Sequence, residues 1–410
     1  MNESTPLKLA VVGAGPVGLA LALHAANALP EAEITLFDAR AADKDVAGDP
    51  RTLALSLGSV QLLERLGAWR AANAQPITEV HVSQQAPSLV AALSARFGEP
   101  ALTLRAADEG VPMLGAVLSY GGIVAPLQAV WLEAAQREPK RLVSRFGAGV
   151  EALKNVAGGV EVDAGIAERF DLAVVAEGGV FAGSAQQARV GGERWPALRH
   201  DYGQTAWVGT ASFETAADMS RTDGVAYERF TRHGPAALLP LRDGRAGLVW
   251  CVVGDDDPVR ELDATQRVAV LNTLFHPATP RLAGISALKS FPLGLIAERT
   301  LTDGRTVRIG NAAQTLHPVA GQGLNLGMRD AFELVRSLAR NRDVDAVLSK
   351  LEWQRAPDRW AMIAATDFLA RSFTWTLPGV GAARGLGLLA LQALGPVKSA
   401  IARQMMFGSR

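Results

Sequence analysis

Two patterns of apolar and polar positions alternate along this chain of 410 residues. The first region predicts a strand at residues 8–12, a helix of small residues to about Asn27 and a second strand at residues 34–38. The middle region changes character, because β-branched and aromatic residues lie between turn signals. Its predicted strands cover residues 202–213, 225–231, 237–241 and 246–253. We expect an α/β domain into which an antiparallel sheet is inserted.

A glycine-rich turn joins the first strand to the first helix. Its sequence, Gly13-Ala-Gly15-Pro-Val-Gly18, has the spacing of a dinucleotide fingerprint, and Asp38 follows at the end of the next strand. In such a turn the first glycine permits the tight bend, the second lets the backbone approach a pyrophosphate and the third lets helix and strand pack closely. The Asp38 carboxylate falls where a ribose hydroxyl needs an acceptor. The alternative is a glycine-rich turn with no ligand.

A second glycine-rich loop lies nearly 300 residues later, between a short strand and a long helix predicted to begin near Asn325. Gly310, Gly321 and Gly323 remove side chains that would keep a ligand off the backbone, and the peptide N–H groups opening the helix carry partial positive charge. The loop suits a planar ring with a carbonyl edge, or else it is a tight turn. A domain for NAD alone has no need of this second cradle, whereas FAD has.

These residues carry a resemblance. Together with His200-Asp-Tyr-Gly-Gln-Thr-Ala206 and Phe230-Thr-Arg-His-Gly-Pro-Ala-Ala-Leu-Leu-Pro240, the two glycine-rich segments resemble the FAD-dependent aromatic hydroxylases of ubiquinone biosynthesis over nearly the whole chain. Within that family, Asn311-Ala-Ala-Gln-Thr-Leu-His-Pro resembles the 2-polyprenyl-6-methoxyphenol hydroxylase branch. The resemblance implies a Rossmann-like FAD-binding domain of the aromatic (class A) flavin monooxygenase type, an inserted antiparallel β-sheet substrate domain and a C-terminal helical region.

The resemblance also implies the chemistry. FAD would be reduced by NAD(P)H, docked transiently, and would react with O2 to give a flavin 4a-hydroperoxide that hydroxylates the ring of a lipophilic polyprenyl phenol. The sequence holds no second complete dinucleotide fingerprint, so NADH and NADPH both remain open. Two other functions also stay open. One is a different FAD oxidoreductase, acting on another aromatic substrate, and the other is a non-catalytic scaffold among ubiquinone-biosynthesis proteins.

Candidate cofactor-binding residues come from both loops and from positions that match the family. They are Gly13, Ala14, Gly15, Pro16, Val17, Gly18, Asp38, Arg51, Glu177, Asn311, Pro318, Gly321, Gln322, Gly323, Leu324 and Asn325. Candidate substrate-binding residues are aromatic, amide or apolar and lie on the predicted sheet. They are Tyr202, Gln204, Tyr227, Phe230, Leu239 and Pro240. No catalytic residue is assigned; His317 is either an acid/base or, as we favour, a brace for its loop.

Three positions depart from the family pattern where the family contacts flavin or supports its reduction. Pro50 replaces the glycine before Arg51, Ala125 replaces a Gln or Arg, and Glu177 replaces an Asp whose segment also carries a serine. The unusual Ser119-Tyr-Gly-Gly122 precedes Ala125. These changes place FAD affinity in question and favour the scaffold alternative if no flavin binds.

The predicted flavin domain is discontinuous. It takes residues 1–75, 101–182 and 286–345, the sheet domain takes residues 76–100 and 183–285, and the helical region takes residues 346–410. The C-terminal segment from Phe373 to Phe407 is rich in apolar residues, but its charges prevent a bilayer span. It either packs over the flavin domain, which we favour, or lies on a membrane surface.

Composition fits a cytoplasmic enzyme, with peripheral contact at the inner face of a membrane as an open hypothesis. Lys plus Arg equals Asp plus Glu at 41 each, which gives no field that attracts nucleic acid. The single cysteine, Cys251, suits a reducing compartment and is expected to be a buried core thiol. The six histidines lack ligand spacing, so we expect no metal. No signal peptide is recognised at the N-terminus.

Overall fold

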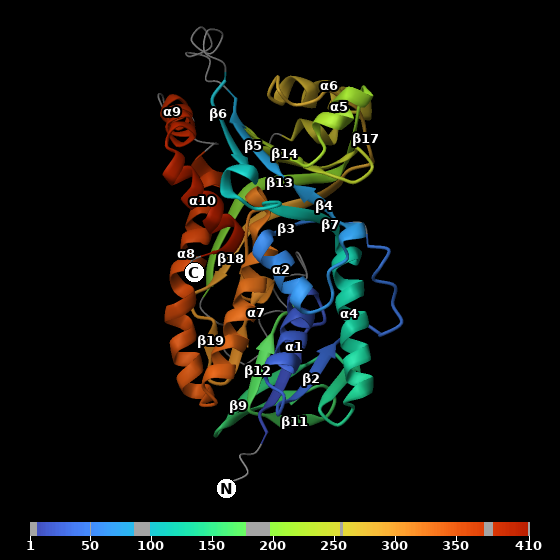
Figure 1. The fold of residues 1–410 in the computed structure, drawn as a ribbon, viewed down its shortest axis with the longest axis vertical. Helices are drawn as coiled ribbons and strands as arrows, with labels where there is room; N and C mark the ends of the chain where they lie inside the picture. Colours follow the sequence, from blue (N-terminus) through green and yellow to red (C-terminus); the bar gives the residue numbers. More distant parts are fainter. Residues whose placement is uncertain are drawn as a thin grey trace.

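A computed structural model describes residues 6–49, 51–85, 99–177, 197–254, 257–372 and 380–408. Within these residues, the chain forms a lower body around a parallel sheet and an upper body around a larger, mostly antiparallel sheet (Figure 1). A small third sheet lies between the two bodies. C-terminal helices run along one side of both (Figure 1).

The lower body is built on a six-stranded sheet. Its strands, in spatial order, are β19 (Thr302–Asp303), β20 (Thr306–Arg308), β12 (Leu172–Val175), β1 (Lys8–Val12), β2 (Glu33–Asp38) and β8 (Leu142–Phe146). All neighbours pair in parallel except β19 and β20. The carboxyl ends of β1, β12 and β20 therefore meet at one edge, which is where ligands bind in open α/β sheets.

Both faces of this sheet are covered. Helices α1 (Pro16–Ala28), α4 (Tyr120–Arg137) and α7 (Gln322–Arg340) share one apolar core with it. The opposite face packs on a three-stranded antiparallel sheet of β9 (Ala152–Val156), β10 (Gly159–Asp163) and β11 (Ala167–Phe170). The central strands read as continuous apolar runs because neither of their faces meets water.

The upper body is a nine-stranded sheet. Its strands are β21 (Gln314–Thr315), β18 (Lys289–Glu298), β13 (Ala197–Phe213), β16 (Ala246–Val253), β15 (Gly234–Pro240), β14 (Val225–Thr231), β5 (Glu79–Gln84) and β6 (Ala101–Arg105), with β17 (Leu282–Ile285) beside β13. The four predicted strands of the middle region all belong to it. Cys251 is buried in β16, where burial raises the pKa of its thiol, as a core position requires.

The expected domain boundaries differ from this arrangement at two places. β6, β18 and β21 belong to the upper sheet, although the residue ranges 101–182 and 286–345 assign them to the flavin domain. The reason is hydrogen bonding, since β6 completes the open edge of β5 and β18 completes that of β13. Residues 86–98 and 183–196, which the expected sheet domain includes, lie outside the described part of the chain.

The small third sheet connects the two bodies. It consists of β3 (Thr52–Ser56), β7 (Gly115–Ser119) and β4 (Gln75–Ile77), and it leads directly into helices α2 (Leu57–Arg65) and α4. β3 and β7 pair with Thr52 opposite Ser119. This register places the residue before β3 next to the first residue of α4.

The C-terminal helices are α8 (Val344–Ser372), α9 (Val380–Ala393) and α10 (Gly395–Phe407). α9 packs on β6 and α10 on α2, which agrees with the favoured packing of this segment. Residues 373–379 fall outside the described part. Among described residues, no single helix has the length and apolar character of a bilayer span, although Ala383–Ala393 and Gly395–Phe407, bent by 95°, pass together by length and composition.

Candidate cofactor and substrate site

The turn after β1 has three glycines with three different surroundings. A Cβ on Gly13, whose φ is +104°, would lie 2.9 Å from the Glu177 backbone nitrogen, and a Cβ on Gly18 would lie 1.9 Å from the Gly13 oxygen. Around a Cβ on Gly15, by contrast, the Tyr120 hydroxyl at 3.8 Å is the only atom of the described residues within 4 Å. Gly13 and Gly18 are therefore required by packing, whereas Gly15 faces open space.

Asp38, at the end of β2, holds this turn. Its Oδ2 accepts a hydrogen bond from the Ala14 N–H at 2.5 Å, and its Oδ1 accepts from the Arg40 N–H at 2.7 Å. Its side chain keeps 15% exposure. The carboxylate is thus fixed beside the open side of the turn, where its remaining lone pairs can accept from a ribose hydroxyl.

Arg51 and Tyr120 lie side by side where β3 and β7 pair. The Arg51 Cζ is 4.1 Å from the centroid of the Tyr120 ring, and Arg51 Nη2 is 2.7 Å from Asp49 Oδ2. Hydrogen bonding to Asp49 raises the pKa of Arg51, so this side chain is a permanent cation beside the turn. Pro50 lies outside the described residues, and its effect on the backbone remains a prediction.

Gln128 occupies α4 one turn beyond Ala125, the position that lacks a side-chain donor. Gln128 is buried; its Oε1 accepts from Arg40 Nη1 at 3.0 Å and its Nε2 donates to the Ala42 oxygen at 3.2 Å. Arg40 also donates to the Ala14 oxygen at 3.2 Å. The connection from Gln128 through Arg40 to the glycine turn was not predicted from the sequence. The i, i+3 spacing of Ala125 and Gln128, which places both on one face of α4, could have indicated it.

Glu177 follows the carboxyl end of β12 and lies against the glycine turn. Desolvation of its carboxyl group and the negative charge of Asp38 raise the pKa of Glu177. Two carboxylates therefore share this end of the sheet. Because the next residues lie outside the described part of the chain, the role of Glu177 toward a cofactor stays a prediction.

The second glycine-rich loop opens α7 earlier than expected. The helix begins at Gln322, not near Asn325, and its N-cap is Gly321 with φ +59°. No side chain caps the helix, its first turn holds no acidic residue, and a Cβ on Gly323 would have no atom within 4 Å. The N–H groups that open α7 therefore receive no side-chain cap, and the positive end of the helix dipole lies at this loop.

The two glycine-rich segments meet in the fold. A Cβ on Gly327 would lie 2.8 Å from Gly310 Cα and 2.8 Å from Val17 Cγ2, and a Cβ on Gly310 would lie 3.3 Å from that same valine carbon. α1 and α7 thus pack through glycines, which brings the N-terminal fingerprint beside a loop nearly 300 residues away. Asn311, half-buried, and Pro318 lie on this loop.

Asn325 serves the protein rather than an open face. Its Nδ2 donates to the oxygens of Ala54 and Gly321 at 3.0 and 3.1 Å, and its Oδ1 accepts from the Ser56 N–H and the Ser59 hydroxyl, both at 2.8 Å. All four hydrogen-bonding positions of the amide are used. Its side chain ties α7 to β3 and α2 and leaves none of these positions for a cofactor.

His317 braces the second loop, which is the favoured interpretation. It is 1% exposed; Nδ1 accepts from the Val319 N–H at 3.2 Å, so Nε2 carries the proton and donates to Gln204 Oε1 at 3.0 Å. The Tyr202 ring packs edge-on against it at 5.2 Å, and the Tyr202 hydroxyl donates to Asp367. Tyr202 and Gln204 therefore support the loop instead of lining an open wall.

The other candidate substrate residues divide between core and loop. Tyr227 is buried, and its hydroxyl donates to the Arg221 oxygen within the upper body. Leu239 and Pro240 lie near the junction with the third sheet, Leu239 partly buried and Pro240 buried. Phe230, 2% exposed, packs against Val319 of the second loop. Phe230 therefore contacts the second loop from β14.

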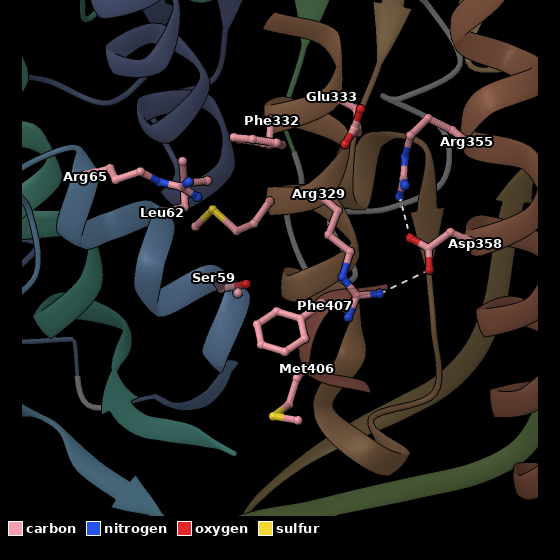
Figure 2. Close-up of a pocket in the computed structure, with 12 residues that line it drawn as sticks. Ser59, Leu62, Arg65, Arg329, Phe332, Glu333, Arg355, Asp358, Met406 and Phe407 are labelled. Atoms are coloured by element: carbon pink, nitrogen blue, oxygen red, sulfur yellow. Dashed lines mark hydrogen bonds and ion pairs between the residues drawn. The ribbon is translucent and has the colours of Figure 1, made fainter. Parts of the chain in front are cut away.

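A small pocket beside α7 is lined by charged side chains and by residues of α10. Figure 2 shows Arg329 and Arg355 pointing at Asp358, with Phe407 and Met406 of α10 beside them. Its volume of about 20 Å³ holds about one water molecule, far too little for a flavin. Arg329 Nη2 also donates to the Met405 oxygen at 2.8 Å, so this buried charge cluster fixes the C-terminus to α7.

Burial of His317 predicts a pH dependence of stability. Desolvation lowers the pKa of His317 to about 4 from 6.5. The unfolded chain therefore binds more protons than the folded chain does. The contribution of neutral His317 to the free energy of unfolding is present above pH about 6.5 and should fall by about 3 kcal/mol as pH drops to about 4. His24, also with a pKa of about 4, titrates in the same window.

The measurement is thermal unfolding across this pH range for the wild type and for His317→Gln. The variant should lose less stability than the wild type on acidification, because the His317 contribution is gone while those of His24, His81, His276 and the carboxylates remain. Equal slopes in the two proteins would show that His317 is not a buried neutral base.

Among the described residues, no group of three His, Cys, Asp or Glu side chains that could hold a metal ion occurs.

Comparison with known proteins gives a consistent result. The family profile described as FAD binding domain matches residues 197–366. The 3-demethoxyubiquinol 3-hydroxylase of Escherichia coli is 28% identical over 411 residues, covering 96% of each chain. The ubiquinone hydroxylase UbiL of Rhodospirillum rubrum is 36% identical over 212 residues; that match spans 50% of this chain and about half, 48%, of the relative.

Solved structures agree over the full length. HpxO of Klebsiella pneumoniae, complexed with FAD and uric acid, has a TM-score of 0.67 at 17% identity and covers 97% of both chains. The p-nitrophenol 4-monooxygenase PnpA of Pseudomonas putida has a TM-score of 0.70 at 15% identity and covers 99% of both. The chain shares its fold with these enzymes. The expected fold, a Rossmann-like domain with an inserted sheet and C-terminal helices, is confirmed.

The residues of this site fit FAD. α1 begins after Gly15 without a side-chain cap and without an acidic residue in its first turn, which leaves its N–H groups for a diphosphate. α7 begins in the same open way beside it. The two helix N-termini lie together because Val17 of α1 packs against Gly310 and Gly327. This arrangement matches a long cofactor, with its diphosphate at the start of α1 and its planar ring at the start of α7.

Proposed function

We propose that this chain is an FAD-dependent monooxygenase that hydroxylates the aromatic ring of a polyprenylated phenol, of the 2-polyprenyl-6-methoxyphenol type, in ubiquinone biosynthesis. NAD(P)H supplies the electrons and O2 the oxygen atom. The observation that carries the proposal is the packing of α1 against α7, which joins two uncapped helix N-termini into one cradle. Relatives aligned over most of their length support it, since their names describe ubiquinone-pathway hydroxylases.

When bound, FAD supplies the redox and oxygen-transfer chemistry. The chain's own residues bind and orient it. The α1 N-terminus and the fixed carboxylate of Asp38 hold the diphosphate and ribose end. The α7 N-terminus, placed by Asn325 and Gly321, favours negative charge at its open end.

Water must be kept from the reacting atoms, and the upper body provides the means. Phe230 and Val319 form an apolar contact between β14 and the second loop. A buried hydrogen bond between His317 and Gln204 holds that loop in place. Because burial keeps the His317 ring neutral, this bond brings no charge to the site. A dry, apolar wall of this kind suits a phenol that carries an isoprenoid tail.

Contact with a membrane surface belongs to this proposal, because a polyprenyl phenol dissolves in lipid. Four apolar side chains on α9 and α10 support it by their exposure, which ranges from 43% to 67%. They are Leu386, Leu389, Leu394 and Val397. Co-sedimentation of the purified protein with lipid vesicles tests this part, and protein that stays in the supernatant would remove it.

The function is tested by the visible spectrum of the purified protein and by NAD(P)H oxidation in air, with and without a short-tailed 2-polyprenyl-6-methoxyphenol. Flavin absorbance and faster NAD(P)H oxidation in the presence of the phenol are expected. Flavin without any response to the phenol would retain the oxidoreductase and reject this substrate. Protein that stays colourless after incubation with FAD would favour the scaffold alternative.

A further inference from the structure

A phenol hydroxyl borders the open side of the fingerprint turn. Tyr120 Oη lies 3.8 Å from the Cβ position of Gly15, and it alone among the described atoms lies within 4 Å of that position. Gly15 is the glycine that lets the backbone approach a diphosphate. A diphosphate seated over Gly15 therefore lies within reach of the Tyr120 hydroxyl.

The backbone holds Tyr120 firmly in this place. Its N–H donates to the Arg51 oxygen at 2.6 Å, and the next N–H, of Gly121, donates to the Asp49 oxygen at 3.1 Å. A Cβ on Gly121 would lie 2.2 Å from the Ala47 oxygen, so the loop after β2 is closely packed on the start of α4. Gly121 is thus required by the local packing, and it fixes the backbone next to Tyr120.

The chemistry of the pair suits an anion. Arg51 contributes a permanent positive charge above the Tyr120 ring, and its guanidinium can only donate hydrogen bonds. Burial raises the pKa of Tyr120, against the opposing effect of the Arg51 and Arg40 charges, so the phenol keeps its proton at neutral pH. The protonated hydroxyl can therefore donate a hydrogen bond to an acceptor.

Ala125, on the next turn of α4, has no donor to offer. We propose that the Tyr120 hydroxyl donates a hydrogen bond to the diphosphate of bound FAD, and that the Tyr120–Arg51 pair supplies the side-chain contact missing at Ala125. This inference rests on the proposed FAD-dependent function. It assigns Tyr120, a residue outside the sequence-derived set, to cofactor binding.

The test measures FAD affinity of the apoprotein by flavin fluorescence quenching, and ADP affinity by displacement of FAD. Tyr120→Phe keeps the ring and the stacking on Arg51 but removes the hydroxyl. It should weaken FAD and ADP binding by the same factor, about ten- to a hundredfold, as expected for a hydrogen bond to a charged group. The matched control is Thr222→Val, which removes a buried hydroxyl that donates to the Met219 oxygen at 2.7 Å in the upper body and should leave both affinities unchanged.

Four outcomes decide the matter. Equal losses for FAD and ADP in Tyr120→Phe, with the apoprotein melting as the wild type does, support the contact. Unchanged affinity overturns it while the proposed function stands. A loss for FAD without a loss for ADP also overturns it, because the hydroxyl would then contact another part of the cofactor. A wild type that binds no FAD overturns both the contact and the proposed function.

Discussion

Gly15→Val should abolish FAD binding and leave the apoprotein folded. Gly15 has φ −77° and ψ −176°, a conformation open to valine, and a Cβ there meets its nearest described atom at 3.8 Å. The added methyl groups instead occupy the space through which a diphosphate reaches the backbone. We expect a loss of affinity of at least about a hundredfold, measured by flavin fluorescence, with no change in the melting temperature of the apoprotein.

Two other glycines provide controls for this variant. Gly387→Val places the same side chain on exposed α9 with no atom within 4 Å, and it should bind FAD as the wild type does. Gly18→Val drives a Cβ to 1.9 Å from the Gly13 oxygen and should prevent folding. A yellow, fully loaded Gly15→Val protein would refute the assignment of this turn to the cofactor.

Arg355→Met should destabilise the protein by about 3–5 kcal/mol. Arg355 Nε donates to Asp330 Oδ1 at 2.7 Å, and Nη2 lies 2.9 Å from Asp358 Oδ2, with side chains that are 4%, 1% and 2% exposed. Methionine keeps much of the volume but leaves two carboxylates in the interior without this cation. Denaturant or thermal unfolding of the apoprotein measures the loss.

Arg305→Met is the matched control. Arg305 forms an ion pair of similar length, 2.7 Å, with Asp345, but the Asp345 side chain is 68% exposed. Exposed pairs contribute at most about 1 kcal/mol because water already screens them. If the two variants melt alike, the cluster of Figure 2 does not stabilise the junction between α7, α8 and α10.

The sequence predicted those features that depend on local spacing. The turn from Gly13 to Gly18 needs its glycines for contacts a few residues away or to one neighbouring strand, and the β14 and β16 bounds match the predicted strands. His317 as a brace for its loop also agrees with the structure. In each case a residue type and its nearest neighbours in sequence were enough.

Other features depend on partners distant in sequence. β6 and β18 belong to the upper sheet because of edges that only the fold creates. Asn325 looks like a cofactor ligand in its motif, yet Ala54, Ser56 and Ser59 occupy its amide. Tyr120 lies beside Arg51 because β3 and β7 pair in one register, and the two residues are far apart in sequence.

Product analysis under isotopically labelled O2 tests the central claim most directly. The purified protein is supplied with FAD, NADPH or NADH, and a short-tailed 2-polyprenyl-6-methoxyphenol, and the phenol is examined by mass spectrometry. A monooxygenase places one labelled oxygen atom on the aromatic ring and oxidises one NAD(P)H per product. Oxygen consumption that yields only hydrogen peroxide, with the phenol recovered unchanged, would contradict the proposed hydroxylase.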